Sequence, residues 1–274
     1  MSRASGDVFE YYFAFVLCIS NVQPSDNYTR NKISRLVGKL DSPWDISITD
    51  RRSLVHMISK FLSKFEGMTS FAMKADNSGV NADTSDISIM QETGTSINIS
   101  LKRNNCSAKH QRPSNLEGQM NITNYSSAYK TLNDYWFSQL SVYTQFCQID
   151  KDTKLSMLRD FNELYAGHIN ANQHRKSDLL DFLTSNKIKN KYIVKWENHH
   201  LSIYNCAKLN VPDTMYAEVR DNYITLEFFD AECEVILEVT CRLHTAKKDV
   251  TKNLSIKYDT KIANMEKVYD LRVI

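Results

Sequence analysis

The sequence predicts a mixed α/β fold (α+β) with a β-rich C-terminal meander. Three observations indicate this class. Apolar residues recur at helical spacing near the N-terminus and in the middle of the chain, polar and apolar residues alternate over residues 86–102, and β-branched and aromatic residues alternate after Pro212. At 274 residues, the chain is long enough for one large domain or two small ones.

Two helices are expected before the first strands. Residues 6–22 are predominantly apolar and predict a buried helix, which the Asn-, Asp- and Pro-rich stretch QPSDNYTRN then ends. Over residues 50–66, apolar side chains recur every three to four positions behind Thr49 or Asp50, either of which can cap a helix. The polar stretch KADNSGVNADTS then leads to the first strands.

The stretch DISIMQETGTSINISLK, residues 86–102, predicts a β-hairpin that turns around Gly94. Strands have a period of two, so one face of the hairpin is apolar and consists of Ile87, Ile89, Ile97, Ile99 and Leu101. The opposite face runs from Asp86 at the head of the first strand to Lys102 at the tail of the second. Pairing puts Asp86 opposite Ser100 or opposite Lys102, and both registers bring the acid close to the ammonium group.

Further helices and a meander complete the expected fold. The stretch RPSNLEGQMNITNYSS is expected to be a loop, and helical periodicity then predicts helices over about 133–148, 154–165 and 176–184. After Pro212, the stretch YAEVRDNYITLEFFDAECEVILEVTCRLHT alternates as an antiparallel meander does, and LSIKYDTK at 254–261 adds one more strand.

The composition is that of a folded protein without a membrane segment. Hydrophobic residues make up 42% of the chain and charged residues 24%, and no apolar stretch approaches the ~20 residues of a membrane-spanning helix. The net charge of +2 does not by itself indicate nucleic-acid binding. Six cysteines without a CxxC pair favour buried, reduced thiols and a cytoplasmic location. Asp7 and Glu10 precede the run YYFAFVLCIS, which argues against a signal peptide.

Asp86 and Lys102 admit two interpretations. The first is a cross-strand salt bridge on a solvated sheet face, worth less than ~1 kcal/mol. The second is metal-assisted phosphodiester hydrolysis, in which the carboxylate binds a hard divalent cation and the lysine stabilises charge on the phosphate. Asp83 competes with Asp86 for the metal role, but Asp86 begins the alternating strand and so points where Lys102 points.

Basic and amide side chains cluster directly after Lys102. These candidates for DNA contact are Arg103, Asn104, Lys109, His110 and Arg112. The alternative is a solvated basic loop. The lysine-rich stretch KIKNKYIVK, residues 187–195, is also able to follow phosphates, but a solvated surface is the simpler interpretation.

These motifs resemble those of the HaeIII-type restriction endonucleases, a branch of the PD-(D/E)XK nucleases. The resemblance starts from DISI…NISLKRNN…AKHQR, and similar short segments follow the same order over nearly the whole chain: GDVFEYYFAF, NDYW, CRLHTAKK and LSIKYDTKI. It implies a single endonuclease domain over 1–274, with a restriction-endonuclease-like core at about 1–130, a helical middle at about 131–200 and a β-rich DNA-recognition part at about 201–274. The core is then a mixed central sheet flanked by helices.

The resemblance also implies a function: a Mg²⁺-dependent type II endonuclease of a bacterial restriction-modification system, which cuts double-stranded DNA at a short palindrome such as GGCC. Asp86 would bind the metal and Lys102 would be the catalytic lysine. The position two before the lysine, normally an acid, is Ser100, so a second carboxylate must come from elsewhere. Glu10 is the candidate, because related nucleases supply one from the first helix; the alternative is an acid that favours the helix dipole. A palindrome also suggests a homodimer.

Arg242 and His244 are candidates for base recognition. They share one face of the strand CRLHT, and arginine is the usual partner of guanine; the alternative is an exposed strand face. Two rival functions remain. Ser100 favours a catalytically inactive, sequence-specific DNA-binding protein of the same fold, and Cys106 with His110 suggests a thiol hydrolase, although the sequence indicates no oxyanion hole for it.

Overall fold

The chain forms two compact units. The structure is a computed structural model, and it describes residues 4–39, 48–74, 85–103, 112–184, 190–197, 199–206, 209, 211–220, 222–245, 247–265 and 267–272. Unit 1 comprises Met1–Cys106, Ser185–Leu209 and Glu266–Ile274, and unit 2 comprises Ser107–Thr184 and Asn210–Met265. These boundaries differ from the expected divisions near residues 130 and 200, and a single endonuclease domain over 1–274 stays a prediction.

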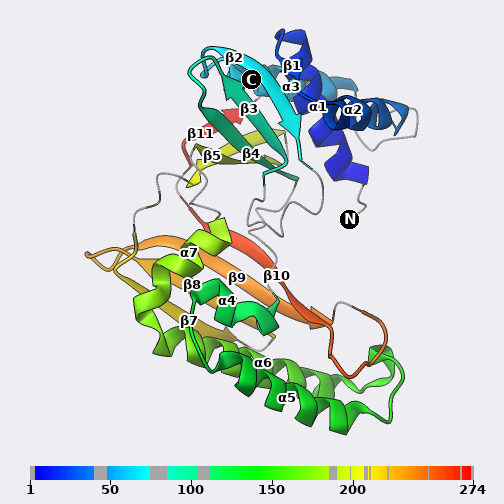
Figure 1. The fold of residues 1–274 in the computed structure, drawn as a ribbon, viewed down its shortest axis with the longest axis vertical. Coiled ribbons are helices and arrows are strands. Elements are labelled where there is room, and N and C mark those ends of the chain that lie inside the picture. Colours follow the sequence, from blue (N-terminus) through cyan, green and yellow to red (C-terminus); the bar gives the residue numbers. More distant parts are fainter. Residues whose placement is uncertain are drawn as a thin grey trace. The chain divides into compact units, whose positions relative to one another are not determined.

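Unit 1 contains a seven-stranded sheet in the order β1-β2-β3-β4-β5-β6-β11 (Figure 1). Its strands are β1 (Gln23–Pro24), β2 (Met68–Met73), β3 (Ile87–Gln91), β4 (Ser96–Arg103), β5 (Lys191–Glu197), β6 (His200–Asn205) and β11 (Tyr269–Arg272). β1 runs parallel to β2 and β4 parallel to β5, whereas the other neighbours are antiparallel. The sheet is therefore mixed, and the predicted hairpin is β3 with β4.

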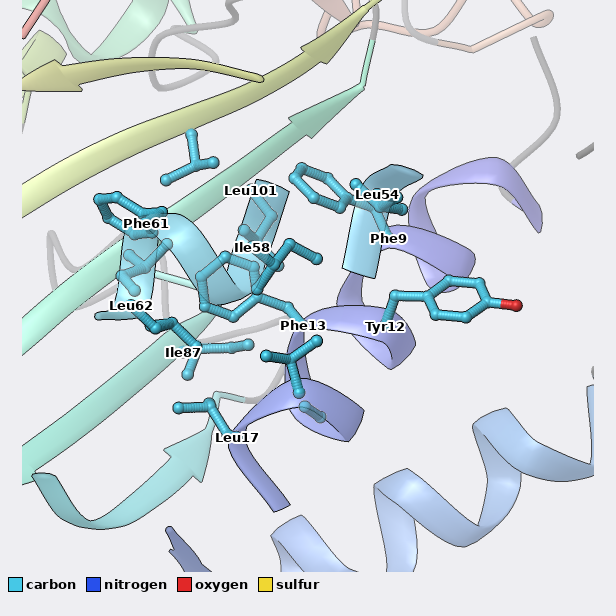
Figure 2. Close-up of a cluster of buried hydrophobic side chains, with 14 of the residues drawn as sticks. Phe9, Tyr12, Phe13, Leu17, Leu54, Ile58, Phe61, Leu62, Ile87 and Leu101 are labelled. Carbon is cyan, nitrogen blue, oxygen red and sulfur yellow. The ribbon is translucent and has the colours of Figure 1, made fainter. Parts of the chain in front are cut away.

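Three helices accompany this sheet: α1 (Ala4–Ile19), α2 (Asn27–Lys39) and α3 (Ile48–Leu62). α1 and α3 bury apolar side chains against β3 and β4, and Figure 2 shows Phe13 of α1 and Phe61 of α3 gathered near Ile87 of β3. The rings of Phe13 and Phe61 meet edge to face, with centroids 6.2 Å apart. Burying one such side chain contributes about 1.5–3 kcal/mol. Because side chains alternate along a strand, the polar residues of the hairpin point away from these two helices.

Helix α2 is absent from the sequence predictions because it is mostly polar and begins inside the stretch QPSDNYTRN. The Asp26 carboxylate caps it by accepting the Thr29 N–H at 2.6 Å, and this hydrogen bond lowers the pKa of Asp26. Thr29 Oγ1 accepts the N–H of Met73, at the end of β2, at 3.0 Å. The cap and the bond to β2 therefore fix a helix that apolar periodicity alone does not reveal.

Unit 2 contains a four-stranded antiparallel sheet in the order β10-β9-β8-β7 (Figure 1). Its strands are β7 (Thr214–Arg220), β8 (Tyr223–Phe229), β9 (Val235–Thr245) and β10 (Ile256–Asn264), and its helices are α4 (Leu116–Met120), α5 (Tyr125–Leu140), α6 (Lys151–Ala171) and α7 (Lys176–Thr184). The ring of Tyr165 in α6 lies 4.9 Å from that of Tyr258 in β10. The predicted meander and its additional strand are thus confirmed.

The edge strand β7 is held by side chains from α6 and from the 3₁₀ turn η4 (Gln173–Arg175) that follows it. Asn170 Nδ2 donates to Ala217 O at 2.9 Å, and Asn170 Oδ1 accepts the N–H of Ala217 at 2.8 Å. Gln173 Oε1 accepts the N–H of Met215 at 2.9 Å. These backbone groups of β7 therefore have side-chain partners where a further strand would otherwise pair.

The helix expected over 133–148 lies over 125–140 instead, so the preceding stretch is not only a loop. Tyr125 is fully buried at its start. Beyond Leu140 the Gln148 side chain accepts the N–H groups of Thr144 and Gln145, at 3.0 and 2.9 Å. These side-chain bonds stabilise a turn after the helix, whereas Tyr143 and Phe146 continue the apolar spacing and so extended the prediction past the end of the helix.

Two smaller expectations are wrong in part. Lys191 of β5 is 1% exposed, so the solvated surface expected for the lysine-rich stretch is wrong at this position, while Lys187 and Lys189 lie outside the described residues. Burial of cysteines is found only at Cys206 and Cys241, and the other described thiols are exposed: Cys18, Cys147 and Cys233.

Candidate functional site

Asp86 lies directly before β3, at the end of the predicted hairpin. Its N–H donates to Ile99 O in β4 at 2.7 Å, and its C=O accepts the N–H of Lys74, the residue after β2, at 2.8 Å. The strand register pairs Ile87 with Ile99, so continuing it by one residue puts Asp86 opposite Ser100. This is the first of the two registers that the sequence allowed.

The Asp86 carboxylate is close to the Lys102 ammonium group on the neighbouring strand. Asp86 Oδ2 accepts the N–H of Leu101 at 2.6 Å, which fixes the orientation of the carboxylate. The same oxygen lies 4.0 Å from Lys102 Nζ, and the Asp86 and Lys102 side chains are 28% and 21% exposed. Water screens an ion pair at this distance, so it contributes little stability. The expected proximity is confirmed, whereas the chemical roles of both residues stay predictions.

Ser100 occupies the position two before the lysine. It is 1% exposed and donates its hydroxyl to Asp86 Oδ2 at 3.3 Å. A hydroxyl in this position supports the Asp86 carboxylate but does not supply a second one.

Glu10 of α1 pairs with Lys32 of α2, a residue that the sequence analysis did not single out. Lys32 Nζ lies 2.8 Å from Glu10 Oε2 and donates to Lys74 O at 3.1 Å. Burial by itself lowers the pKa of Lys32, but attraction to Glu10, assisted by Tyr28 and Asp86, outweighs burial and raises the pKa. Lys32 is therefore charged and interacts electrostatically with both carboxylates.

Lys32 was missed because α2 was missed. It follows Thr29 by three residues, so both side chains lie on one face of the helix. That face is turned toward the end of β2, where Thr29 bonds to Met73 and Lys32 bonds to Lys74. The sequence signal was Asp26 three residues before Thr29, which is a helix-capping spacing.

Asp86 and Glu10 are the side chains that would hold a metal ion. Both offer carboxylate oxygens, the type of ligand that Mg²⁺ prefers, and Mg²⁺ commonly takes only one or two carboxylates together with waters and substrate phosphates. Among the described residues, there is no group of three or more His, Cys, Asp and Glu side chains arranged to hold a metal. Lys32 pairs with Glu10 and interacts electrostatically with Asp86, and joint binding of an ion by the two carboxylates stays a prediction.

The basic segment after Lys102 is described only at its two ends. Arg103 closes β4, although its side chain is outside the described set, and Arg112 is exposed directly before the 3₁₀ turn η2 (Pro113–Asn115). The remaining candidates lie outside the described residues, and their roles stay predictions: Asp83, Asn104, Cys106, Lys109 and His110.

Arg242 and His244 share the face of β9 that is opposite its buried side chains, as their spacing predicted. Arg242 is exposed, and the strand register sets it between Tyr223 of β8 and Asp259 of β10. His244 Nε2 lies 3.1 Å from Asp259 Oδ2, and the His244 side chain is 33% exposed. The role of Arg242 and His244 in base recognition stays a prediction.

Comparison with known proteins found no matching family model, no matching curated protein and no matching solved structure. Within the described part of the chain, no helix is both long and apolar enough to cross a membrane.

Proposed function

We propose that this protein is a Mg²⁺-dependent type II restriction endonuclease that hydrolyses phosphodiester bonds in both strands of DNA. The observation that carries the proposal is the 4.0 Å distance between Asp86 Oδ2 and Lys102 Nζ across neighbouring strands. A mixed sheet flanked by helices is compatible with a restriction-endonuclease-like core. Because one fold can host many functions, the site carries more weight than the fold.

Side chains and backbone around Asp86 have separate tasks in the proposed reaction. Asp86 and Glu10 would hold the ion, which when bound supplies a water of lowered pKa and stabilises charge on the phosphate. The Leu101 N–H and the Ser100 hydroxyl keep the Asp86 carboxylate in one orientation. Lys102 offers a positive charge and hydrogen-bond donors to the phosphate oxygens, where negative charge develops during hydrolysis.

Target recognition in this proposal belongs to unit 2. Arg242 is exposed on β9, and arginine is the usual bidentate partner of guanine, as a GGCC-like palindrome requires. The basic segment after Lys102 would contact phosphates, which position the DNA without reading its sequence. Because a palindrome has two-fold symmetry, the proposal includes a homodimer, acting in a bacterial cytoplasm.

The test is digestion of a plasmid of known sequence by the purified protein with Mg²⁺. We expect discrete fragments whose ends all lie at one short palindrome, and sequencing those ends gives the recognition site and the cut position. Intact plasmid at every Mg²⁺ and Mn²⁺ concentration, or cleavage that persists in EDTA, would rule the proposal out. Alkylating the thiols should leave cleavage unchanged, which separates this activity from a thiol hydrolase.

A second candidate is a catalytically inactive DNA-binding protein of the same fold. Ser100 favours it, because this side chain donates to Asp86 where an acid would normally provide a metal ligand. Titration of Mg²⁺ into protein and plasmid distinguishes the two functions. Retarded but intact DNA would support the binding protein, and fragments would support the nuclease.

A further inference from the structure

Each carboxylate of the proposed metal site has a lysine beside it. Glu10 pairs with Lys32, and Asp86 lies near Lys102. A positive charge next to a carboxylate opposes a divalent ion that approaches the same oxygen. Each lysine therefore competes with an ion for its carboxylate.

Lys32 is held more closely by its partner than Lys102 is. The Lys32 ammonium lies 2.8 Å from Glu10 Oε2, whereas Lys102 Nζ is 4.0 Å from Asp86 Oδ2. Lys32 is also only 8% exposed, so water screens its charge less than that of a surface lysine. At hydrogen-bonding distance, the ammonium group and a metal ion compete for the same carboxylate oxygen.

We propose that Lys32 is a positioning residue that acts as the internal counter-ion of Glu10, and that a divalent ion gains Glu10 as a ligand only by displacing the Lys32 ammonium group. This inference rests on the proposed function, because it concerns the metal site of that reaction. Lys32 keeps Glu10 neutralised and near the end of β2 while no ion is bound. It thereby sets the ion concentration at which the site fills.

The local structure lets the ammonium group move while α2 stays in place. The Asp26 cap and the bond between Thr29 and Met73 anchor the helix independently of Lys32. Lysine carries its charge on a flexible four-carbon chain, and Lys74 O already accepts one of its donors at 3.1 Å. Displacement therefore requires rotation of one side chain only.

A purely structural ion pair predicts a different response to loss of Lys32. Removing Lys32 takes a positive charge from beside the partly buried Glu10 carboxylate and destabilises the fold. If that were the whole role of Lys32, its removal would leave metal affinity unchanged or weaken it. If Lys32 competes with the ion, its removal strengthens metal binding.

Mn²⁺ binding to the full chain without DNA separates these accounts, since the electron paramagnetic resonance signal of free Mn²⁺ yields a Kd that does not depend on cleavage. Lys32→Gln removes the charge but keeps an amide donor for Glu10 and Lys74. We expect it to bind Mn²⁺ about tenfold more tightly than wild type, because a positive charge beside the ion is gone. Lys32→Met also removes the charge but keeps an apolar chain of similar length in place, so it should bind Mn²⁺ more tightly by the same factor. With two such variants, the test does not fail if one of them does not fold.

Matched variants identify the cause of any gain. Lys32→Arg keeps the charge and should bind Mn²⁺ like the wild type, as should Lys60→Gln, which removes an exposed lysine of α3 in the same unit. In the double variant with Glu10→Gln, the gain from Lys32→Gln should disappear, because the carboxylate that it releases is absent.

The failures of this inference and of the proposed function are distinguishable. Wild-type binding of Mn²⁺ with equal or weaker binding by Lys32→Gln and Lys32→Met would overturn the role of Lys32 and leave the nuclease proposal standing. Absence of Mn²⁺ binding in the wild type and in both variants would overturn the role of Lys32, and plasmid digestion with Mg²⁺ would decide the nuclease proposal separately.

Discussion

Replacing Asp86 by Asn and by Ala separates the chemical role of its carboxylate from its structural role. Asn keeps an oxygen that can accept the Leu101 N–H and the Ser100 hydroxyl, whose distances to Asp86 Oδ2 are 2.6 and 3.3 Å. Ala removes this acceptor. Both variants lose the attraction to Lys102, which at 4.0 Å and in partly exposed surroundings is worth about 0–1 kcal/mol.

These contacts set the expected magnitudes. Asp86→Asn should lower the free energy of unfolding by less than about 1 kcal/mol, because only the screened ion pair is lost. Asp86→Ala should cost about 1–3 kcal/mol, because the Leu101 N–H loses its acceptor in a region of low exposure. Both variants should lose detectable cleavage, because neither retains the negative charge that the ion requires.

Urea denaturation followed by circular dichroism measures the stability of each variant, and plasmid digestion measures its activity. Asp213→Asn, at an exposed position in unit 2, is the control and should change neither quantity. Equal stability of the Asn and Ala variants would refute the hydrogen-bond argument. Cleavage by Asp86→Asn at a rate close to that of the wild type would refute the role of Asp86 in the reaction.

Four further outcomes are expected. Lys102→Ala should slow cleavage by about 10²–10³-fold or more and leave DNA retardation in gels unchanged, and retained cleavage would contradict the mechanism. Arg242→Ala should weaken binding to the target by about 1–3 kcal/mol in anisotropy competition, whereas an equal loss on unrelated DNA would indicate a phosphate contact. Asn133→Ala should cost about 1–3 kcal/mol in urea denaturation, because buried Asn133 bonds twice to the segment before β10; no loss would show these bonds to be dispensable. Folding lowers the pKa of Asp26, so the stability that this carboxylate contributes is present above its unfolded pKa of about 4 and is lost as the pH falls. The free energies of unfolding of wild type and Asp26→Asn, measured over an acid titration, should therefore converge at low pH. A difference in stability that stays constant with pH would contradict this linkage.

The hairpin could be predicted because its sequence contains both the strand period and the turn. Alternation from residue 86 to 102 determines which side chains share a face, and Gly94, with φ of 77°, adopts the left-handed conformation that the turn requires. The proximity of Asp86 and Lys102 follows from these local rules. Helices α1, α3 and α7 were predictable for the same reason, since their apolar spacing is local.

The rest of the site depends on pairing between distant segments, which local patterns do not contain. β5 lies parallel to β4 although more than ninety positions separate Lys102 from its register partner Lys195, and this pairing buries part of a lysine-rich stretch that polarity alone marks as surface. Lys32 reaches Glu10 only because a polar helix is capped by Asp26 and bonded to β2. Tertiary contacts thus overrode composition at both positions.

The hydrogen bonds of Asn170 and Gln173 to β7 also limit how copies of the chain can associate. An unprotected edge strand invites another chain to continue the sheet, which leads to open-ended assemblies. With the Met215 N–H and both polar backbone groups of Ala217 already bonded to side chains, that route is blocked along this part of the edge. A second copy that docks on this part of β7 would therefore meet side chains and not open backbone groups.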